Sequence, residues 1–347
     1  MEQAKTAGNA IIVIAAIVII LGALKMASVI VVPFLLAGFI ATIISPLYSG
    51  LIKKRVPTVV ALLMVVGGLV IVFSLLGVLV GSSVQSFSGN IPLYEEKLHV
   101  QLSSITEMLG RHGLIKGDLT SIFDPTRLMQ YSATVLKGAG SVLTNSFMIL
   151  LIIVFILLES TQFAKKLDYA DGERGTMKYV NEILTKIKHY MALKAVISLA
   201  TGIVVTVALM VIGLDYAVLW GLVAFLFNFI PNIGSILAAV PAVLLAFVQL
   251  GTFGMFEVGF VYLAVNIVIG SIMEPRLMGQ GLGISTLVVF LSLIFWGWLF
   301  GPIGMLLSIP LTIMIKIMLN SSAKTRWLAI LIGNEEGGAE AKNLNDA

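Results

Sequence analysis

Glu274 and Arg276 are the charged residues of this sequence that are best placed to do chemistry. They have opposite signs, flank Pro275, and precede a glycine-rich segment and an uncharged run that ends at residue 315. A charge inside a membrane costs about 2.5–3.5 kcal/mol on insertion scales, so it normally faces a partner or a solute path. We predict a gate or coupling site at Glu274, Pro275 and Arg276. An ion pair between the two charges that only fixes the membrane topology is the alternative.

A second set of polar residues interrupts the uncharged stretch of residues 216–250. Pro231 cannot donate a backbone hydrogen bond, so a helix must break there, and a bare carbonyl in hydrocarbon costs several kcal/mol. Nearby amide and hydroxyl side chains can repair the break, or they can bind a polar solute. We predict a substrate pathway along it, formed by Asn228, Pro231, Asn232, Gly234, Ser235 and, from the next span, Asn266.

Glycines and prolines mark the positions where the C-terminal half can bend. Three glycines in five residues can take positive φ, and prolines interrupt helices. The expected hinge residues are Gly279, Gly281, Gly283, Gly301, Pro302 and Pro310. The glycine segment is no nucleotide loop, because it neither follows a strand nor opens a βαβ unit. The order Pro231, Gly234, Pro241 is echoed by Pro302, Gly304, Pro310; such paired interruptions favour a transporter, although two short matches can also arise by chance.

Several classes of protein lack the residues they need here. The chain has no cysteine, and its three histidines are never at metal-ligand spacing, so neither a metal site nor a catalytic site is expected. No motif for ATP or another cofactor is present, and any active transport must use a gradient. The small net charge of +4 indicates contact with anionic lipid headgroups and not with nucleic acid.

The elements that must position these residues are membrane helices. The chain is 59% hydrophobic and 12% charged, whereas soluble domains carry roughly a quarter charged residues. Its apolar blocks have membrane-spanning length. We predict an all-α polytopic membrane protein with about eight membrane elements, two of them broken helical hairpins. The expected order is three N-terminal spans in residues 1–81, an external amphipathic helical segment in 82–140, a fourth span in 141–160, a cytoplasmic basic segment in 161–194, a C-terminal transport core with both hairpins in 195–319, and a cytoplasmic tail in 320–347.

Basic residues set the expected orientation. Residues 53–55 are Lys-Lys-Arg, and residues 161–194 hold seven bases against four acids. The positive-inside rule places both segments, and therefore both termini, in the cytoplasm. The first hairpin break then faces inward and the turn at Gly301 faces outward.

Residues 227–235 and the run Glu274-Pro275-Arg276-Leu277-Met278-Gly279, continued to Pro310, resemble the signature of the autoinducer-2 exporter (AI-2E) family of bacterial inner-membrane proteins. The resemblance covers nearly the whole chain. It implies export of a small polar solute, such as the quorum-sensing signal autoinducer-2, without ATP. It further implies a homo-oligomer, and a pentamer is the size it suggests.

Some members of that family are assigned to sodium/proton antiport, so exchange of sodium ions for protons is the alternative function. The two functions need different groups: a neutral polyol-like signal needs hydroxyls and amides, whereas cation exchange needs a carboxylate deep in the membrane. The polar residues expected at depth are amides and a serine, which favours the solute. Glu274 keeps the ion alternative open.

Overall fold

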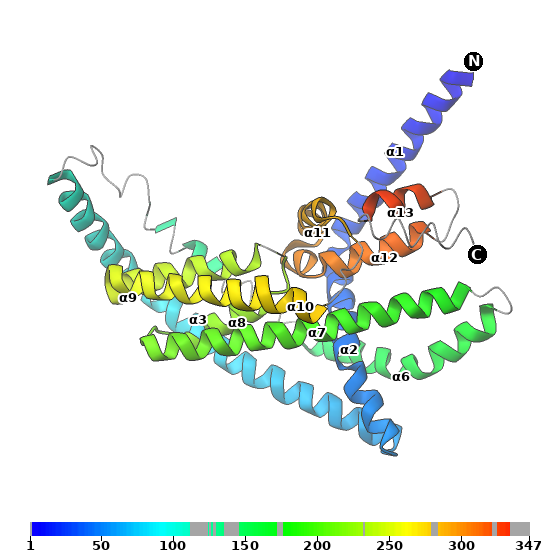
Figure 1. Ribbon diagram of the computed structural model, residues 1–347, viewed down its shortest axis with the longest axis horizontal. Helices are drawn as coiled ribbons and strands as arrows, with labels where there is room; N and C mark the ends of the chain where they lie inside the picture. The colour runs from blue at the N-terminus through cyan, green and yellow to red at the C-terminus, as the bar shows by residue number, and fades with distance from the viewer. Residues whose placement is uncertain are drawn as a thin grey trace. The chain divides into compact units, whose positions relative to one another are not determined.

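The described part of the protein is helical throughout. The computed structural model describes residues 2–111, 124, 126–127, 130–134, 146–171, 176–231, 233–278, 284–320 and 325–333 (Figure 1). Five helices in these ranges are long and apolar enough to cross a membrane, and four shorter apolar helices accompany them. The predicted all-α polytopic fold is therefore confirmed.

The chain divides into two compact units, and each contains segments that are distant in the sequence. Unit 1 comprises residues 1–42, 148–183 and 282–347, and unit 2 comprises residues 43–147 and 184–281. The helices α2 (Ser28–Lys53), α6 (Ser146–Asp171) and α7 (Thr176–Ile212) each begin in one unit and end in the other. Unit 2 holds the break at Pro231, and unit 1 holds the turn at Gly301.

A single long helix, α3 (Thr58–Arg111), belongs entirely to unit 2. The sequence predicts a span that ends near residue 81 and a separate amphipathic helix after it, but the structure continues without a break. The reason is an unbroken apolar stripe at spacings of three and four residues, the pattern of a helix seam. Its buried or half-buried members are Val80, Val84, Phe87, Ile91, Tyr94, Leu98, Leu102 and Ile105.

The seam of α3 packs on α8 (Ala217–Phe227) and α9 (Gly234–Val265). Phe87 meets the fully buried ring of Trp220 edge to face, with 6.2 Å between ring centroids. Farther along the helix, the side-chain amide of Gln101 donates to the carbonyl of Val248 at 3.4 Å. The apolar stripe in the first part of the predicted amphipathic segment is thus part of the core of unit 2.

The helix α9 consists of two segments that meet at Gly251. This residue has φ 77° and ψ −168°, a conformation open essentially only to glycine. The chain reverses there: Ser235 and Tyr262 line one cavity, although a straight helix would separate them by about 40 Å. Beside the reversal, the Gln249 side chain accepts from the amide of Asp215 at 2.9 Å and donates to the carbonyl of Gly213 at 3.2 Å. Gln249 thereby satisfies the backbone of the turn that precedes α8.

Unit 1 contains α1 (Glu2–Met26), α11 (Thr286–Leu306), α12 (Ser308–Asn320) and α13 (Arg326–Ile332). The helices α11 and α12 pack on each other, as do α12 and α13. The ammonium of Lys25, at the end of α1, lies 4.3 Å from the ring centroid of Trp298 in α11. An isolated antiparallel bridge joins Ile284 to Gly333 and connects the start of this group to its end.

Gly301 has φ 67°, so α11 bends at the predicted glycine-proline pair. The second interruption is three residues earlier than predicted: it is at Leu307, and Pro310 is the third residue of α12. Proline is tolerated there because a backbone N–H in the first turn of a helix has no partner within the helix.

Candidate functional site

A small closed cavity lies where the helices of unit 2 meet the break at Pro231. Its lining comes from α7 (Thr201, Val205), the end of α8 (Ala224, Asn228), the start of α9 (Ser235), the returning segment of α9 (Tyr262, Val265) and the π-helix η1, Asn266–Met273 (Asn266, Gly270). The cavity volume is about 10 Å³, which is near the lower limit for one water molecule. None of the nine lining residues is of a type that is charged at neutral pH. Tyrosine is the only titratable type among them.

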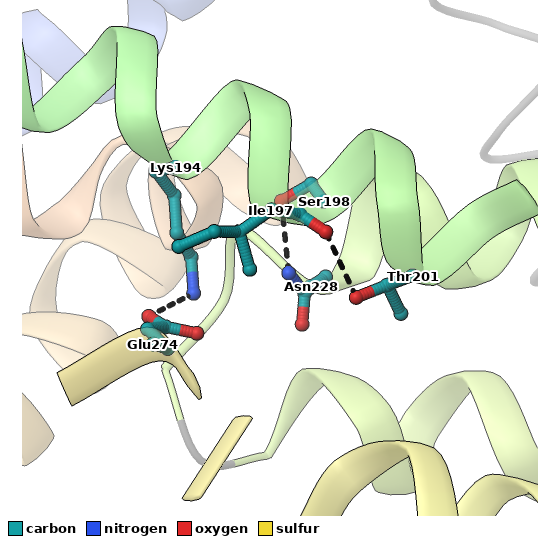
Figure 2. Close-up of polar contacts among 6 residues, drawn as sticks. All are labelled: Lys194, Ile197, Ser198, Thr201, Asn228 and Glu274. Carbon is teal, nitrogen blue, oxygen red and sulfur yellow. Dashed lines mark hydrogen bonds and ion pairs between the residues drawn. The ribbon is translucent and has the colours of Figure 1, made fainter. Parts of the chain in front are cut away.

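The break between α8 and α9 is held by a polar side chain and by a close backbone approach. The side-chain amide of Asn228 donates to the hydroxyl of Ser198 on α7 at 2.9 Å (Figure 2). A Cβ at Gly234 would collide with the carbonyl of Phe227, so only glycine allows α9 to start this close to the end of α8. The side-chain amide of Asn228 therefore ties the break to α7, and the same residue lines the cavity.

A stripe of polar residues on α7 faces this region. Lys194, Ser198 and Thr201 follow each other at helical spacing, and all three are buried. The hydroxyl of Thr201 donates to the carbonyl of Ile197 at 3.0 Å (Figure 2). Ser and Thr hydroxyls commonly bond back to their own helix, and the oxygen of Thr201 can still accept a bond from another group.

The helix opposite this stripe is distorted where it reaches the cavity. Residues 266–273 form a π-helix, a rare geometry that is frequent at functional sites. It precedes Pro275, which lacks the N–H that a regular helix needs and would clash with the carbonyl four residues earlier. A Cβ at Gly270 would lie 3.0 Å from the amide oxygen of Asn266, so this side chain lies over the glycine.

An ion pair between Lys194 and Glu274 joins the same two helices one to two turns beyond the cavity. The ammonium and carboxylate are 2.5 Å apart, and their side chains are 7% and 19% exposed (Figure 2). The alternative in which Glu274 pairs with Arg276 is therefore wrong: Arg276 is exposed in α10 (Glu274–Met278), and the partner of Glu274 comes from 80 positions earlier. Two residues apart on one helix, side chains point in different directions and do not meet.

Pro275 is the second residue of α10 and is exposed. The α-helix continues through Glu274 and Arg276 with this proline between them.

The structure brings together three of the predicted pathway residues, Asn228, Ser235 and Asn266, at the cavity. Pro231 and Gly234 belong to the turn beside it. The residues Asn232, Gly279, Gly281 and Gly283 lie outside the described residues. Gly301, Pro302 and Pro310 belong to the α11–α12 hairpin of unit 1.

Four residues of this region were missed from sequence: Lys194, Ser198, Thr201 and Tyr262. Lys194 is the last base of the predicted basic segment. Its position directly before an uncharged span is the feature that could have identified it. Ser198 and Thr201 follow it on one helix face. Tyr262 lies one turn before Asn266 on the same helix face, and this spacing could have identified it. In the ranges that the structure describes, no group of histidine and acidic residues could hold a metal ion.

Comparison with known proteins gives a consistent set of matches. The sequence profile described as AI-2E family transporter matches residues 12–324. The AI-2 transport protein TqsA of Escherichia coli is 39% identical over 328 residues, covering 93% of this chain and 95% of the relative. A candidate transport protein of Haemophilus influenzae is 40% identical over 337 residues with the same coverage. The candidate transport protein YhhT of Escherichia coli is 34% identical over 332 residues, covering 95% of each chain.

Proposed function

The chain belongs to the AI-2E transporter family, and from this premise we propose that it exports a small, neutral, polar solute without ATP hydrolysis. The solute that we propose is autoinducer-2, because TqsA is named for AI-2 transport. The location that goes with this function is the bacterial inner membrane, with both termini in the cytoplasm. Assembly as a homo-oligomer is part of the same proposal.

The chemistry of the cavity lining is the observation that supports a neutral, polar solute. Hydroxyl and amide groups from four elements converge at the helix break, and the same lining holds no carboxylate, lysine or arginine. Such groups bind a neutral hydroxylated molecule through paired donors and acceptors, whereas a transported cation would require more negative charge. The carboxylate of Glu274 is already bonded to Lys194, so its charge is compensated within the protein.

The cavity in its present form holds about one water molecule, so a larger solute passes only if the surrounding helices separate. Two links oppose this separation: the Lys194–Glu274 ion pair, and the hydrogen bond from Asn228 to Ser198. Both tie α7 to elements on the other side of the cavity. We therefore assign Glu274 and Lys194 to a gate, which in the proposed orientation closes the cytoplasmic side.

The gate can be tested with cross-links, because the natural chain contains no cysteine. The double variant Lys194→Cys/Glu274→Cys would be reconstituted in proteoliposomes and oxidised. Transport of autoinducer-2 should stop on oxidation and return after reduction. The matched control is Glu107→Cys/Arg111→Cys, which replaces an exposed ion pair within α3 and should transport equally well in both states.

The solute assignment is tested in the same vesicles without ATP. Wild-type protein should equilibrate autoinducer-2 across the membrane, and Asn266→Ala should slow this flux. Sodium-driven proton movement that Glu274→Gln abolishes, in vesicles that do not transport autoinducer-2, would overturn the proposal in favour of cation exchange.

A further inference from the structure

Tyr262 holds a buried polar group that the protein itself does not use. The residue is 6% exposed, and its hydroxyl has no hydrogen-bond partner among the described residues. Buried tyrosine hydroxyls normally find a partner, because an unpaired one loses the hydrogen bonds that water would give it. An unpaired hydroxyl in a native structure therefore asks for an explanation.

An unpaired group alone does not make a binding site, and this protein shows why. Four buried side chains in the described ranges have an unpaired polar atom: Tyr48, Trp220, Tyr262 and Ser308. Only Tyr262 lines the cavity at the helix break. The other three are buried residues that are absent from the lining of this cavity.

Two neighbours of Tyr262 in the cavity wall use a side-chain donor within the protein. The hydroxyl of Thr201 donates to Ile197, and the amide of Asn228 donates to Ser198. Both bonds leave oxygens as acceptors, whereas the tyrosine hydroxyl keeps both a donor and acceptor capacity. The Tyr262 hydroxyl, unpaired among the described residues, is therefore a donor that lies beside groups that can accept.

Tyr262, in the last turn of α9, and Asn266, the first residue of the π-helix, line the same wall. Tyr262 and Asn266 are four residues apart, which places them on one helix face, and Gly270 continues that face without a side chain. Two polar side chains next to an open position can contact adjacent oxygens of one small molecule. That arrangement fits a compound with neighbouring hydroxyl or carbonyl groups.

We propose that Tyr262 is a specificity-determining residue of the solute site, and that its hydroxyl donates to a hydroxyl or carbonyl oxygen of a small, neutral, hydroxylated solute. This inference rests on the proposed function and identifies the group that distinguishes a hydroxylated solute from its deoxygenated analogue. The discrimination arises because an analogue without that oxygen leaves the buried tyrosine hydroxyl unpaired.

The test compares Tyr262→Phe with Tyr48→Phe in the purified full-length protein. Each variant removes one unpaired buried hydroxyl, but Tyr48 does not line the cavity. The probes are autoinducer-2 and a series of analogues that each lack one oxygen. The readouts are the melting temperature without solute, the increase in melting temperature with solute, and the dissociation constant.

Tyr262→Phe should leave the melting temperature without solute unchanged or raise it, because removal of an unpaired hydroxyl relieves a cost. Its affinity for autoinducer-2 should fall about 2- to 13-fold, the range expected for one neutral hydrogen bond. One analogue should bind the wild-type protein weakly. The variant Tyr262→Phe should bind that analogue and autoinducer-2 with equal affinity. Tyr48→Phe should match the wild type in affinity and in discrimination.

Two results would overturn the inference, and they differ in what they imply for the proposed function. If Tyr262→Phe binds and discriminates like the wild type, Tyr262 has no role in specificity, and the proposed transport stands. If wild-type protein neither binds nor transports autoinducer-2 or any analogue, both proposals fall together. Should Tyr262→Phe not fold, the wild type still decides, because equal affinity for every analogue contradicts a hydroxyl-specific contact.

Discussion

The α8–α9 hairpin and the α11–α12 hairpin share one backbone construction, and their polar groups serve different ends. Each turns at an interruption that contains glycine and proline. Each also contains a glycine at which a Cβ would collide with a backbone carbonyl. Gly234 lies against the carbonyl of Phe227, and Gly304 lies against the carbonyl of Trp296. The sequence echo between the two hairpins therefore has a physical basis in the way each chain segment turns back.

The two hairpins differ in what their polar side chains contact. In the α11–α12 hairpin, the indole N–H of Trp296 donates to the hydroxyl of Thr312 at 3.1 Å, and that hydroxyl donates to the carbonyl of Ser308 at 2.7 Å. In the α8–α9 hairpin, the polar residues line a cavity. The hydroxyl of Ser308 has no partner among the residues that the structure describes, yet no residue of its hairpin is in the cavity lining. A broken helix thus becomes a candidate site only where polar groups meet open space.

Charge gives the largest expected contrast between the two regions, since the α11–α12 hairpin is uncharged up to residue 315 and the cavity has an ion pair beside it. Glu274→Gln should destabilise the protein by about 3 kcal/mol, because it leaves the buried ammonium of Lys194 without a counter-charge. The measurement is reversible unfolding in mixed micelles. Glu107→Gln, in an exposed pair of α3, is the control and should change stability by less than about 1 kcal/mol. Equal effects would mean that the buried pair does not hold α7.

The shared backbone construction predicts equal losses in both hairpins. Gly234→Ala and Gly304→Ala should each cost about 2–3 kcal/mol in the same unfolding experiment, because the new methyl group meets a backbone carbonyl. Gly67→Ala in α3 is the control: nothing lies within 4 Å of its Cβ position, and alanine favours a helix. A large loss in one hairpin only would show that the resemblance between them is superficial.

The two positive-φ glycines test whether both turns need the same backbone freedom. Gly251 and Gly301 have φ of 77° and 67° with extended ψ, and a Cβ at either position would meet no other atom. Alanine at each should therefore cost about 1–2 kcal/mol through backbone strain alone. Circular dichroism during thermal unfolding would measure it. If Gly301→Ala is neutral, the turn of the α11–α12 hairpin can relax in a way that the α9 reversal cannot.

The smallest expected effects separate binding from packing. Asn266→Ala should weaken autoinducer-2 binding by about 2- to 13-fold, the value of one neutral hydrogen bond, with little loss of stability. Thr312→Val should do the opposite: it removes the bond to Trp296 and should cost about 1 kcal/mol of stability while solute affinity stays constant. Calorimetric titration and unfolding of both variants give the four numbers. A loss of affinity in Thr312→Val would place both hairpins in one site.

The sequence alone determined the membrane fold and the positions of the breaks at Pro231 and Gly301. Uncharged runs of spanning length leave few alternatives in lipid, because every backbone group must bond within its own element. Pro231 and Gly301 mark breaks for the same local reason, and the amides Asn228 and Asn266 stand out in apolar runs. These are properties of short windows, which a sequence displays directly.

Tertiary structure alone decided which residues meet. Lys194 finds Glu274 across 80 positions, and α3 continues past residue 81 because its stripe packs on α8 and α9. Tyr262 becomes significant only because the reversal at Gly251 returns it to Ser235 and because no residue in the described part of the chain bonds its hydroxyl. Helical periodicity says which residues share a face, but the partner of a face depends on how the chain turns back, which is settled by packing between distant segments.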